Sequence, residues 1–218
     1  MKIVQLPSKV GHRGRRKPLV CHIIHTTGDT DHDKIVRYYQ ADGTNHQGIG
    51  PHYYIAYDGT IYQFVPESEV AYHAGYTGDG DDNQKAIYEK GREVWTRRIN
   101  EAPWILKTPF VGYNTWFQRW GDEHQSPLTL VTAGAPNDSS IGIEIQEPEH
   151  RQPEKFFDAQ YISLIELLKT SAARNGLLLD RKHVLGHYDV NPIVRAGKDG
   201  DRDPGEAFNW QRVLSTLR

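Results

Sequence analysis

Three short segments, far apart in the sequence, carry residue types that could together hold one metal ion. The segments are 20–27, 184–189 and 201–205, which supply histidines from the first two and an aspartate from the third. Imidazole nitrogens and a carboxylate oxygen suit Zn²⁺, and three protein ligands leave a fourth position for water. The residue types therefore indicate a hydrolytic metal site rather than a structural one.

The pattern of the histidines leaves alternatives among the ligands. Residues 19–25 are apolar enough for a buried strand, and side chains three apart on a strand face opposite sides. His22 and His25 therefore cannot share a ligand face. His183 lies four residues before His187, so it would face the same side on a strand or on a helix, and it stays open as an alternative ligand.

Composition narrows the class of protein. A chain of 218 residues is long enough for one domain with a substantial core. The net charge of −2 argues against a nucleic-acid partner. Cys21 is the single cysteine, so neither an intrachain disulfide nor a multi-cysteine zinc site is expected. No apolar stretch approaches the roughly 20 residues of a membrane span, and the first residues show no signal-peptide core.

Hydrophobic periodicity predicts an α/β fold, with a mixed central sheet flanked by helices and the metal site at its loop edge. Strands are expected at 19–25, 53–57, 60–65, 141–146 and 182–187, with a hairpin turn at Asp58-Gly59. Helices are expected after the capping residues Asp31, Asp158 and Asn209. Gly43 and Gly176 are expected to end the first two helices.

A basic cluster lies near the start of the chain. It consists of Lys9, Arg13, Arg15, Arg16 and Lys17, with His12 among them. The cluster could form a solvated turn or contact an anionic polymer.

Six motifs, in order along the chain, extend the candidate metal segments. They are Ile-Ile-His-Thr-Thr at 23–27, the hairpin at 52–63, Ala-Tyr-His-Ala-Gly at 71–75, Ser-Ile-Gly-Ile-Glu-Ile at 140–145, Gly-His-Tyr-Asp at 186–189, and Asp-Pro-Gly with Phe-Asn-Trp at 203–210. With these motifs the chain resembles the zinc-dependent N-acetylmuramoyl-L-alanine amidases, which share their fold with peptidoglycan recognition proteins. The resemblance covers about residues 19–76 and 138–217.

The resemblance implies particular roles at the metal site. It selects His25, His187 and Asp203 as the zinc ligands, which leaves His22 structural and Asp189 as an outer or turn-forming residue. Glu144 lies between apolar residues, and the pattern alone allows either a solvent-facing or a functional side chain. The resemblance implies that Glu144 takes a proton from the attacking water and returns it to the leaving amine.

Other roles implied by the resemblance concern substrate contact and the oxyanion. His73 and Tyr54 are the candidate substrate-binding residues, with a structural role at the end of a strand as the alternative for His73. Many family members carry a lysine two residues before the aspartate ligand, but Asp201 stands there in this chain. Lys198 or Arg202 could supply the displaced cation.

Residues 79–137 do not match the family core, and we interpret them as an insertion in a single domain spanning 1–218. Four of the five tryptophans lie there, at 95, 104, 116 and 120, and could form a satellite core or line a groove for sugar rings.

The resemblance implies cleavage of the amide between N-acetylmuramic acid and L-alanine in peptidoglycan. The alternatives are a cytoplasmic enzyme that recycles soluble anhydro-muropeptides and a non-catalytic peptidoglycan-binding module. Retention of all three ligands and Glu144 argues against the binding module. Without a visible signal peptide, we expect cytoplasmic synthesis, either with release to the wall as for a phage-type lysin or with a role in recycling.

Overall fold

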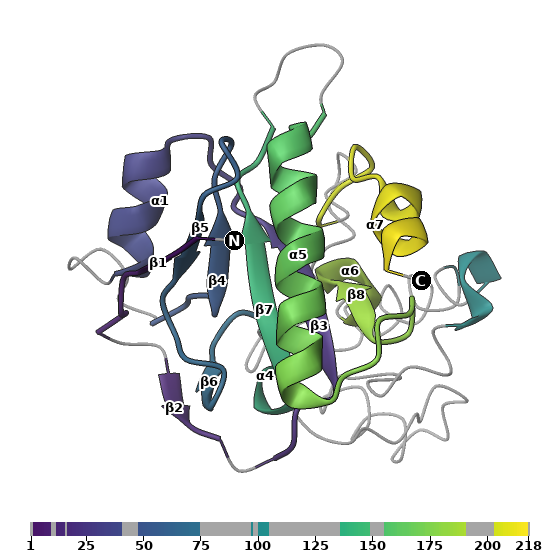
Figure 1. Ribbon diagram of the computed structural model, residues 1–218, viewed down its shortest axis with the longest axis horizontal. Coiled ribbons are helices and arrows are strands. Elements are labelled where there is room, and N and C mark those ends of the chain that lie inside the picture. Colours follow the sequence, from purple (N-terminus) through teal and green to yellow (C-terminus); the bar gives the residue numbers. More distant parts are fainter. Residues whose placement is uncertain are drawn as a thin grey trace, which may run out of the picture.

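The computed structural model has a six-stranded mixed sheet with helices on both faces (Figure 1). It describes residues 2–9, 12–15, 17–40, 48–74, 97, 100–104, 136–148, 155–190 and 203–217. The strands are β1 (Ile3–Gln5), β2 (His12–Gly14), β3 (Cys21–Thr26), β4 (Tyr53–Ile55), β5 (Ile61–Gln63), β6 (Glu69–Ala71), β7 (Ser140–Ile145) and β8 (Val184–Gly186). The helices are α1 (His32–Tyr39), α4 (Pro136–Ser139), α5 (Asp158–Asn175), α6 (His187–Val190) and α7 (Trp210–Thr216).

The order of the strands brings the candidate metal segments to one edge of the sheet. The order is β1-β5-β4-β7-β3-β8, and β4, β7, β3 and β8 run parallel. Strand β5 runs antiparallel to β4, and β1 runs parallel to β5, so the sheet is mixed as predicted. Because parallel strands end at the same edge, the residues that end β3, β7 and β8 meet there.

The two faces of β3 serve different purposes. Nε2 of His22 is 3.0 Å from Oγ of Ser171, a residue of α5. His25 faces the other side of the sheet, toward His187 and Asp203. The predicted opposition of the two histidines is therefore confirmed.

Helices cover both faces. Helix α5 lies across one face with α7 beside it (Figure 1), and the main core lies between this face and the two helices. That core includes Ile24, Ile141, Ile143, Leu164, Leu168 and Val213. On the other face, Ile35 and Tyr39 of α1 pack with Tyr54 and Phe64.

Several local predictions are confirmed. Gly59 turns the β4–β5 hairpin with φ of 82°, a backbone conformation that side chains other than hydrogen disfavour. Asp31 and Asn209 each accept a hydrogen bond from the backbone N–H three residues later, and so cap α1 and α7. Gly176 ends α5 in the left-handed conformation.

Two helix ends differ from the prediction. Phe157, not Asp158, is the N-cap of α5, because Oε1 of Gln160 reaches back to accept from the backbone N–H of Phe157 at 2.9 Å. Helix α1 ends at Tyr39, whereas the predicted end at Gly43 lies outside the described residues.

The basic cluster is partly used by the fold itself. Arg13 forms an ion pair with Asp138 of α4. The guanidinium of Arg15 donates to the carbonyls of Glu67 at 3.1 Å, Asp138 at 2.7 Å and Ser140 at 3.3 Å. These contacts fix the start of the chain against α4 and β7.

Most of the stretch 79–137 lies outside the described residues, so the proposed insertion and the single domain remain predictions. Across the ranges that the structure describes, we find no helix whose length and apolar character would let it cross a membrane.

His22 should make the fold sensitive to acid. Burial lowers the pKa of His22 from 6.5 to about 4, so the folded protein keeps this ring neutral at pH values where the unfolded chain protonates it. Its stabilising contribution is complete above about pH 6.5 and is lost as the pH falls toward 4, which amounts to about 3 kcal/mol. Between pH 7 and 4.5, the unfolding free energy measured by urea titration should fall less for His22→Asn than for the wild type. An equal fall in the two proteins would contradict this assignment.

Candidate metal centre

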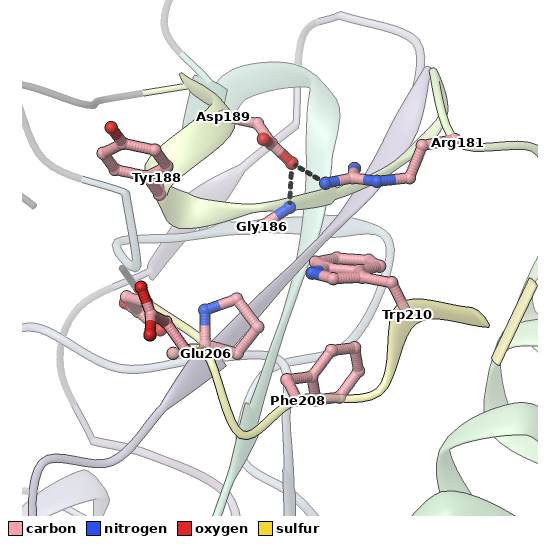
Figure 2. Close-up of a pocket in the computed structure, with 10 residues that line it drawn as sticks. Arg181, Gly186, Tyr188, Asp189, Glu206, Phe208 and Trp210 are labelled. Atoms are coloured by element: carbon pink, nitrogen blue, oxygen red, sulfur yellow. Dashed lines mark hydrogen bonds and ion pairs between the residues drawn. The ribbon is translucent and has the colours of Figure 1, made fainter. Parts of the chain in front are cut away.

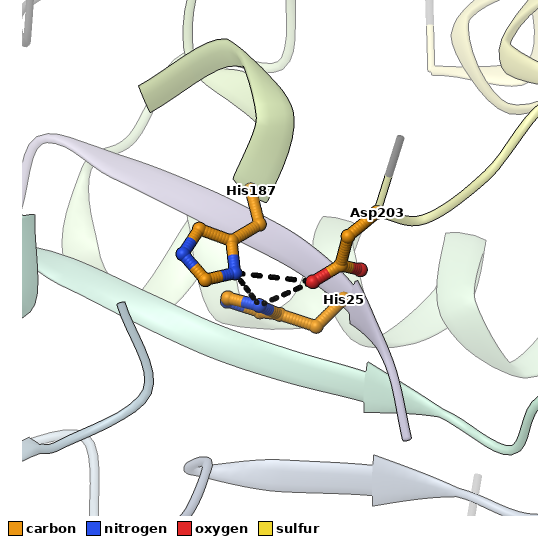
Figure 3. Close-up of side chains that lie close together, drawn as sticks. All are labelled: His25, His187 and Asp203. Carbon is orange, nitrogen blue, oxygen red and sulfur yellow. Dashed lines mark hydrogen bonds and ion pairs between the residues drawn. The ribbon is translucent and has the colours of Figure 1, made fainter. Parts of the chain in front are cut away.

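Three side chains from three separate segments converge at the carboxyl edge of the sheet. Nδ1 of His25 lies 3.0 Å from Nδ1 of His187 and 3.3 Å from Oδ2 of Asp203, and Nδ1 of His187 lies 3.0 Å from the same oxygen (Figure 3). All three residues are buried. Within the described residues, they form the cluster of histidine and carboxylate groups that could hold a metal ion.

The separations of these atoms fit one small cation. Four ligands at the 2.0–2.1 Å of a tetrahedral zinc site lie about 3.3 Å from one another. The three atoms lie 3.0–3.3 Å apart, and each can direct a lone pair at a common centre. Burial opposes ionisation of Asp203, but the imidazoles of His187 and His25 beside it outweigh burial and hold the pKa of its carboxyl well below its usual range. The cluster is thus a buried anionic centre with two imidazoles, which matches Zn²⁺.

The backbone fixes the carboxylate of Asp203. Its Oδ1 accepts from the backbone N–H of Thr26 at 2.6 Å, so Oδ2 is left facing the two imidazoles. Tyr188 N–H donates to the carbonyl of Asp203 at 3.0 Å. A Cβ on Gly186 would lie 2.8 Å from Cδ of Pro204, so glycine is needed for this close approach of the two segments.

His187 begins α6 directly after β8, rather than ending a strand as predicted. The predicted strand 182–187 is shortened because Oδ1 of Asp180 accepts from the backbone N–H of Lys182 at 2.8 Å and holds a turn. Nδ1 of His183 lies 2.7 Å from the same Asp180 oxygen, away from the metal centre. His183 is therefore not placed to act as the alternative ligand.

Asp189 supports the junction that presents His187. Its Oδ2 accepts from the backbone N–H of Gly186 at 2.8 Å and forms an ion pair with Arg181 at 2.6 Å (Figure 2). Arg181 in turn lies over the rings of Trp210 at 3.8 Å and Trp104 at 4.2 Å. Arg181, Asp189 and Trp210 line a cavity of about 210 Å³, together with Asp203 and Pro204. The stacking of Trp104 fits the satellite-core interpretation of that tryptophan.

Glu144 lies beside the metal centre. In the register of the sheet it pairs with His25 on one side and with Tyr54 on the other. Paired residues of neighbouring strands share a face, so the carboxylate of Glu144 and the imidazole of His25 lie on the same side. The residue as a whole is only partly buried, while Oε2 of its carboxylate is buried.

The two predicted substrate-binding residues are buried. Nδ1 of His73 is 2.9 Å from Nε2 of His25, and its Nε2 is 3.1 Å from Oγ of Ser140. Burial first, and then the neighbouring histidines, hold the pKa of His73 well below its usual value. Tyr54 is fully buried and its hydroxyl lies 3.2 Å from Nδ1 of His32, so in this conformation it offers no surface to a substrate.

A larger cavity, of about 420 Å³, opens between the end of β3 and α1. It is lined by Thr27, Gly28, Asp29, Lys34, Ile35, Arg37, Tyr38 and Tyr39. Burial, followed by the negative charges of Glu144 and Asp203, raises the pKa of Tyr39 well above its usual value. Tyr39 therefore lines this cavity and is also close enough to Glu144 and Asp203 for their charges to affect its hydroxyl.

Two predicted catalytic residues, Lys198 and Arg202, lie outside the described residues, as does Asp201. Conversely, the structure gives Thr26 and Ser140 roles that sequence reasoning did not assign. Thr26 lies in the motif at 23–27, next to His25, and Ser140 lies in the motif at 140–145, before Glu144. These positions within the motifs are the sequence features that could have indicated the two roles.

Comparisons with known proteins agree with this geometry. Residues 15–206 match the family described as N-acetylmuramoyl-L-alanine amidase. A 1,6-anhydro-N-acetylmuramyl-L-alanine amidase, AmpD, of Haemophilus influenzae is 37% identical over 82 residues, which is 38% of this chain and 39% of that protein. The AmpD of Enterobacter cloacae is 36% identical over 81 residues, 37% of each chain. The aligned region thus spans about two fifths of these curated relatives.

Solved structures show the same fold. A selenomethionine derivative of AmpD has a TM-score of 0.61 at 18% identity, over 99% of this chain and 94% of that one. The amidase AmiD of E. coli, in complex with anhydro-N-acetylmuramic acid-L-Ala-D-gamma-Glu-L-Lys, has a TM-score of 0.52 at 25% identity, over 91% of this chain and 57% of that one. A mutant endolysin from Bacillus subtilis has a TM-score of 0.51 at 20% identity, over 100% and 99% of the two chains.

Proposed function

Because the chain belongs to the N-acetylmuramoyl-L-alanine amidase family, we propose that it hydrolyses the amide bond between N-acetylmuramic acid and L-alanine. The observation that carries this proposal is the convergence of His25, His187 and Asp203 within 3.3 Å of one another at the carboxyl edge of the sheet. The predicted membership of this family is confirmed, whereas the roles of individual residues are proposals.

We propose that these three residues hold Zn²⁺. When bound there, zinc would supply Lewis acidity that acidifies water and polarises the scissile carbonyl. Asp203 contributes the negative charge. Its Oδ1 is held by the backbone N–H of Thr26, so Oδ2 stays directed at the metal centre. Glu144, on the same face as His25, takes the proton of the attacking water and gives it to the leaving nitrogen.

The substrate proposed is peptidoglycan or a muropeptide derived from it. The cavity between β3 and α1 is lined from Thr27 onward and carries Arg37, a cation that suits the carboxylates of a stem peptide, whereas Lys34 is paired there with Asp29. The curated relatives are named for anhydro-muropeptides, and endolysins are among the proteins with this fold. Both a soluble fragment and the intact wall are therefore kept as candidate substrates, and the same site chemistry is proposed for each.

Mass spectrometry of digests tests this proposal. Purified peptidoglycan and a soluble anhydro-muropeptide are incubated separately with the zinc-loaded protein. We expect free stem peptides that begin with L-alanine, accompanied by sugar products that keep the lactyl group. Preference for one substrate would decide between wall lysis and recycling. Absence of such products from both would contradict the amidase assignment.

A cationic partner for the oxyanion is a separate proposal. Negative charge gathers on the former carbonyl oxygen in the transition state, and a nearby cation stabilises it. We expect Lys198→Ala or Arg202→Ala to lower kcat by about 10²–10³-fold at equal zinc content. Turnover is compared for the two single variants and the double variant. Unchanged turnover in all three would mean that zinc and neutral donors suffice.

A further inference from the structure

The imidazole of His25 is held from behind by a chain of buried groups. Its Nε2 lies 2.9 Å from Nδ1 of His73, and Nε2 of His73 lies 3.1 Å from Oγ of Ser140. The hydroxyl of Ser140 donates to the carbonyl of Pro136 at 2.6 Å. His25, His73 and Ser140 are between 0% and 5% exposed, so water does not compete for these bonds.

The carbonyl at the far end fixes the direction of every bond in the chain. A carbonyl can only accept, so the single proton of the Ser140 hydroxyl points at Pro136. Oγ of Ser140 must then accept, which places a proton on Nε2 of His73. A neutral imidazole carries one proton, so Nδ1 of His73 accepts and Nε2 of His25 donates. Nδ1 of His25 is left with its lone pair, and this is the atom that faces His187 and Asp203.

The fold also fixes His73 in place. Its ring lies against Gly142, where a Cβ would approach the ring to 2.3 Å, so only glycine leaves room for it. Oδ1 of Asn137 accepts from the backbone N–H groups of His73 at 3.1 Å and Ala74 at 2.8 Å. These contacts show that the position of this ring is specified by several elements together.

We propose that Ser140 and His73 are positioning residues, which hold His25 in the tautomer and orientation that bind the metal. Neither residue contacts substrate in this role. The inference rests on the proposed metal centre but not on the proposed substrate, so zinc binding tests it without any assay of hydrolysis. Outer partners of metal-bound histidines typically contribute about 10–100-fold to metal affinity.

The chain offers a matched control for Ser140. Ser171 also hydrogen-bonds a buried histidine of β3, His22, at 3.0 Å, and both serines are fully buried. Ser140→Ala and Ser171→Ala therefore remove the same group from two buried positions on opposite faces of β3. We expect Ser140→Ala to raise the zinc dissociation constant about 10-fold or more, and Ser171→Ala to leave it within about 2-fold of the wild type.

Competition with a chromophoric chelator measures the zinc affinity, and urea unfolding of the zinc-free proteins checks that the two variants are folded. His73→Phe keeps an aromatic ring but removes both nitrogens, so it should lose at least as much affinity as Ser140→Ala. If the two residues act through one series of hydrogen bonds, adding Ser140→Ala to His73→Phe should lower the zinc affinity little further. Long-range ¹H–¹⁵N spectra of the zinc-loaded wild type should show His25 and His73 protonated at Nε2.

Two results would overturn the inference. One is an equal zinc affinity for Ser140→Ala and Ser171→Ala, and the other is a proton on Nδ1 of His73 in the zinc-loaded protein. A wild-type protein that binds no zinc would overturn the metal centre itself and the inference with it. Zinc binding without hydrolysis of muropeptides would leave this inference intact and contradict only the proposed function.

Discussion

His187→Ala should lose tight zinc binding and hydrolysis together, while His183→Ala should keep both. Nδ1 of His187 is 3.0 Å from Nδ1 of His25 and 3.0 Å from Oδ2 of Asp203, so its removal takes away one of three converging ligands. Loss of a ligand should lower the zinc affinity by more than the roughly 10–100-fold that is typical for loss of an outer partner. Metal analysis after gel filtration, together with chelator competition, measures the loss.

His183 is the matched control because it lies four residues earlier and carries the same side chain. It is partly exposed and its Nδ1 faces Asp180, not the metal centre. If His183→Ala released zinc and His187→Ala retained it, the ligand assignment would be wrong. A loss of zinc in both variants would point to general destabilisation, which unfolding of the zinc-free proteins would reveal.

Local patterns predicted the elements of the fold that depend on neighbouring residues. The opposite faces of His22 and His25 follow from the two-residue period of a strand, and the β4–β5 hairpin follows from Asp58-Gly59. The boundary of β8 was wrong because the apolar pattern does not reveal a side chain that holds a turn. Asp180 does so through the backbone of Lys182.

The supports of the metal centre depend on contacts between distant residues, which periodicity cannot show. Thr26 and Asp203 meet across 177 residues of sequence, and His73 and Ser140 across 67. Motif order identified His25, His187 and Asp203 without giving their surroundings. The burial of His73 against Gly142 also depends on the sheet register, so its contact with His25 became evident only in three dimensions.

Glu144→Gln should keep zinc and the fold but lose most turnover. Glutamine has nearly the same shape as glutamate and can still accept hydrogen bonds, but it cannot take a proton from water at neutral pH. A positioned acid–base group typically contributes about 10²–10⁴-fold, which corresponds to about 3–5 kcal/mol in activation free energy. We expect kcat and kcat/KM to fall together, because proton transfer occurs only in the transition state.

Glu147→Gln is the control, since it makes the same change three residues along the chain, beyond the end of β7. It should leave kcat within about 2-fold of the wild type, because Glu147 is only partly buried and lies beyond the strand that carries Glu144. Zinc content separates two explanations for a loss in Glu144→Gln. Full zinc with low turnover supports proton transfer by Glu144, because His25, His187 and Asp203 are then still assembled. Reduced zinc in step with activity would mean that Glu144 acts through His25, its neighbour in the sheet, and not on the attacking water.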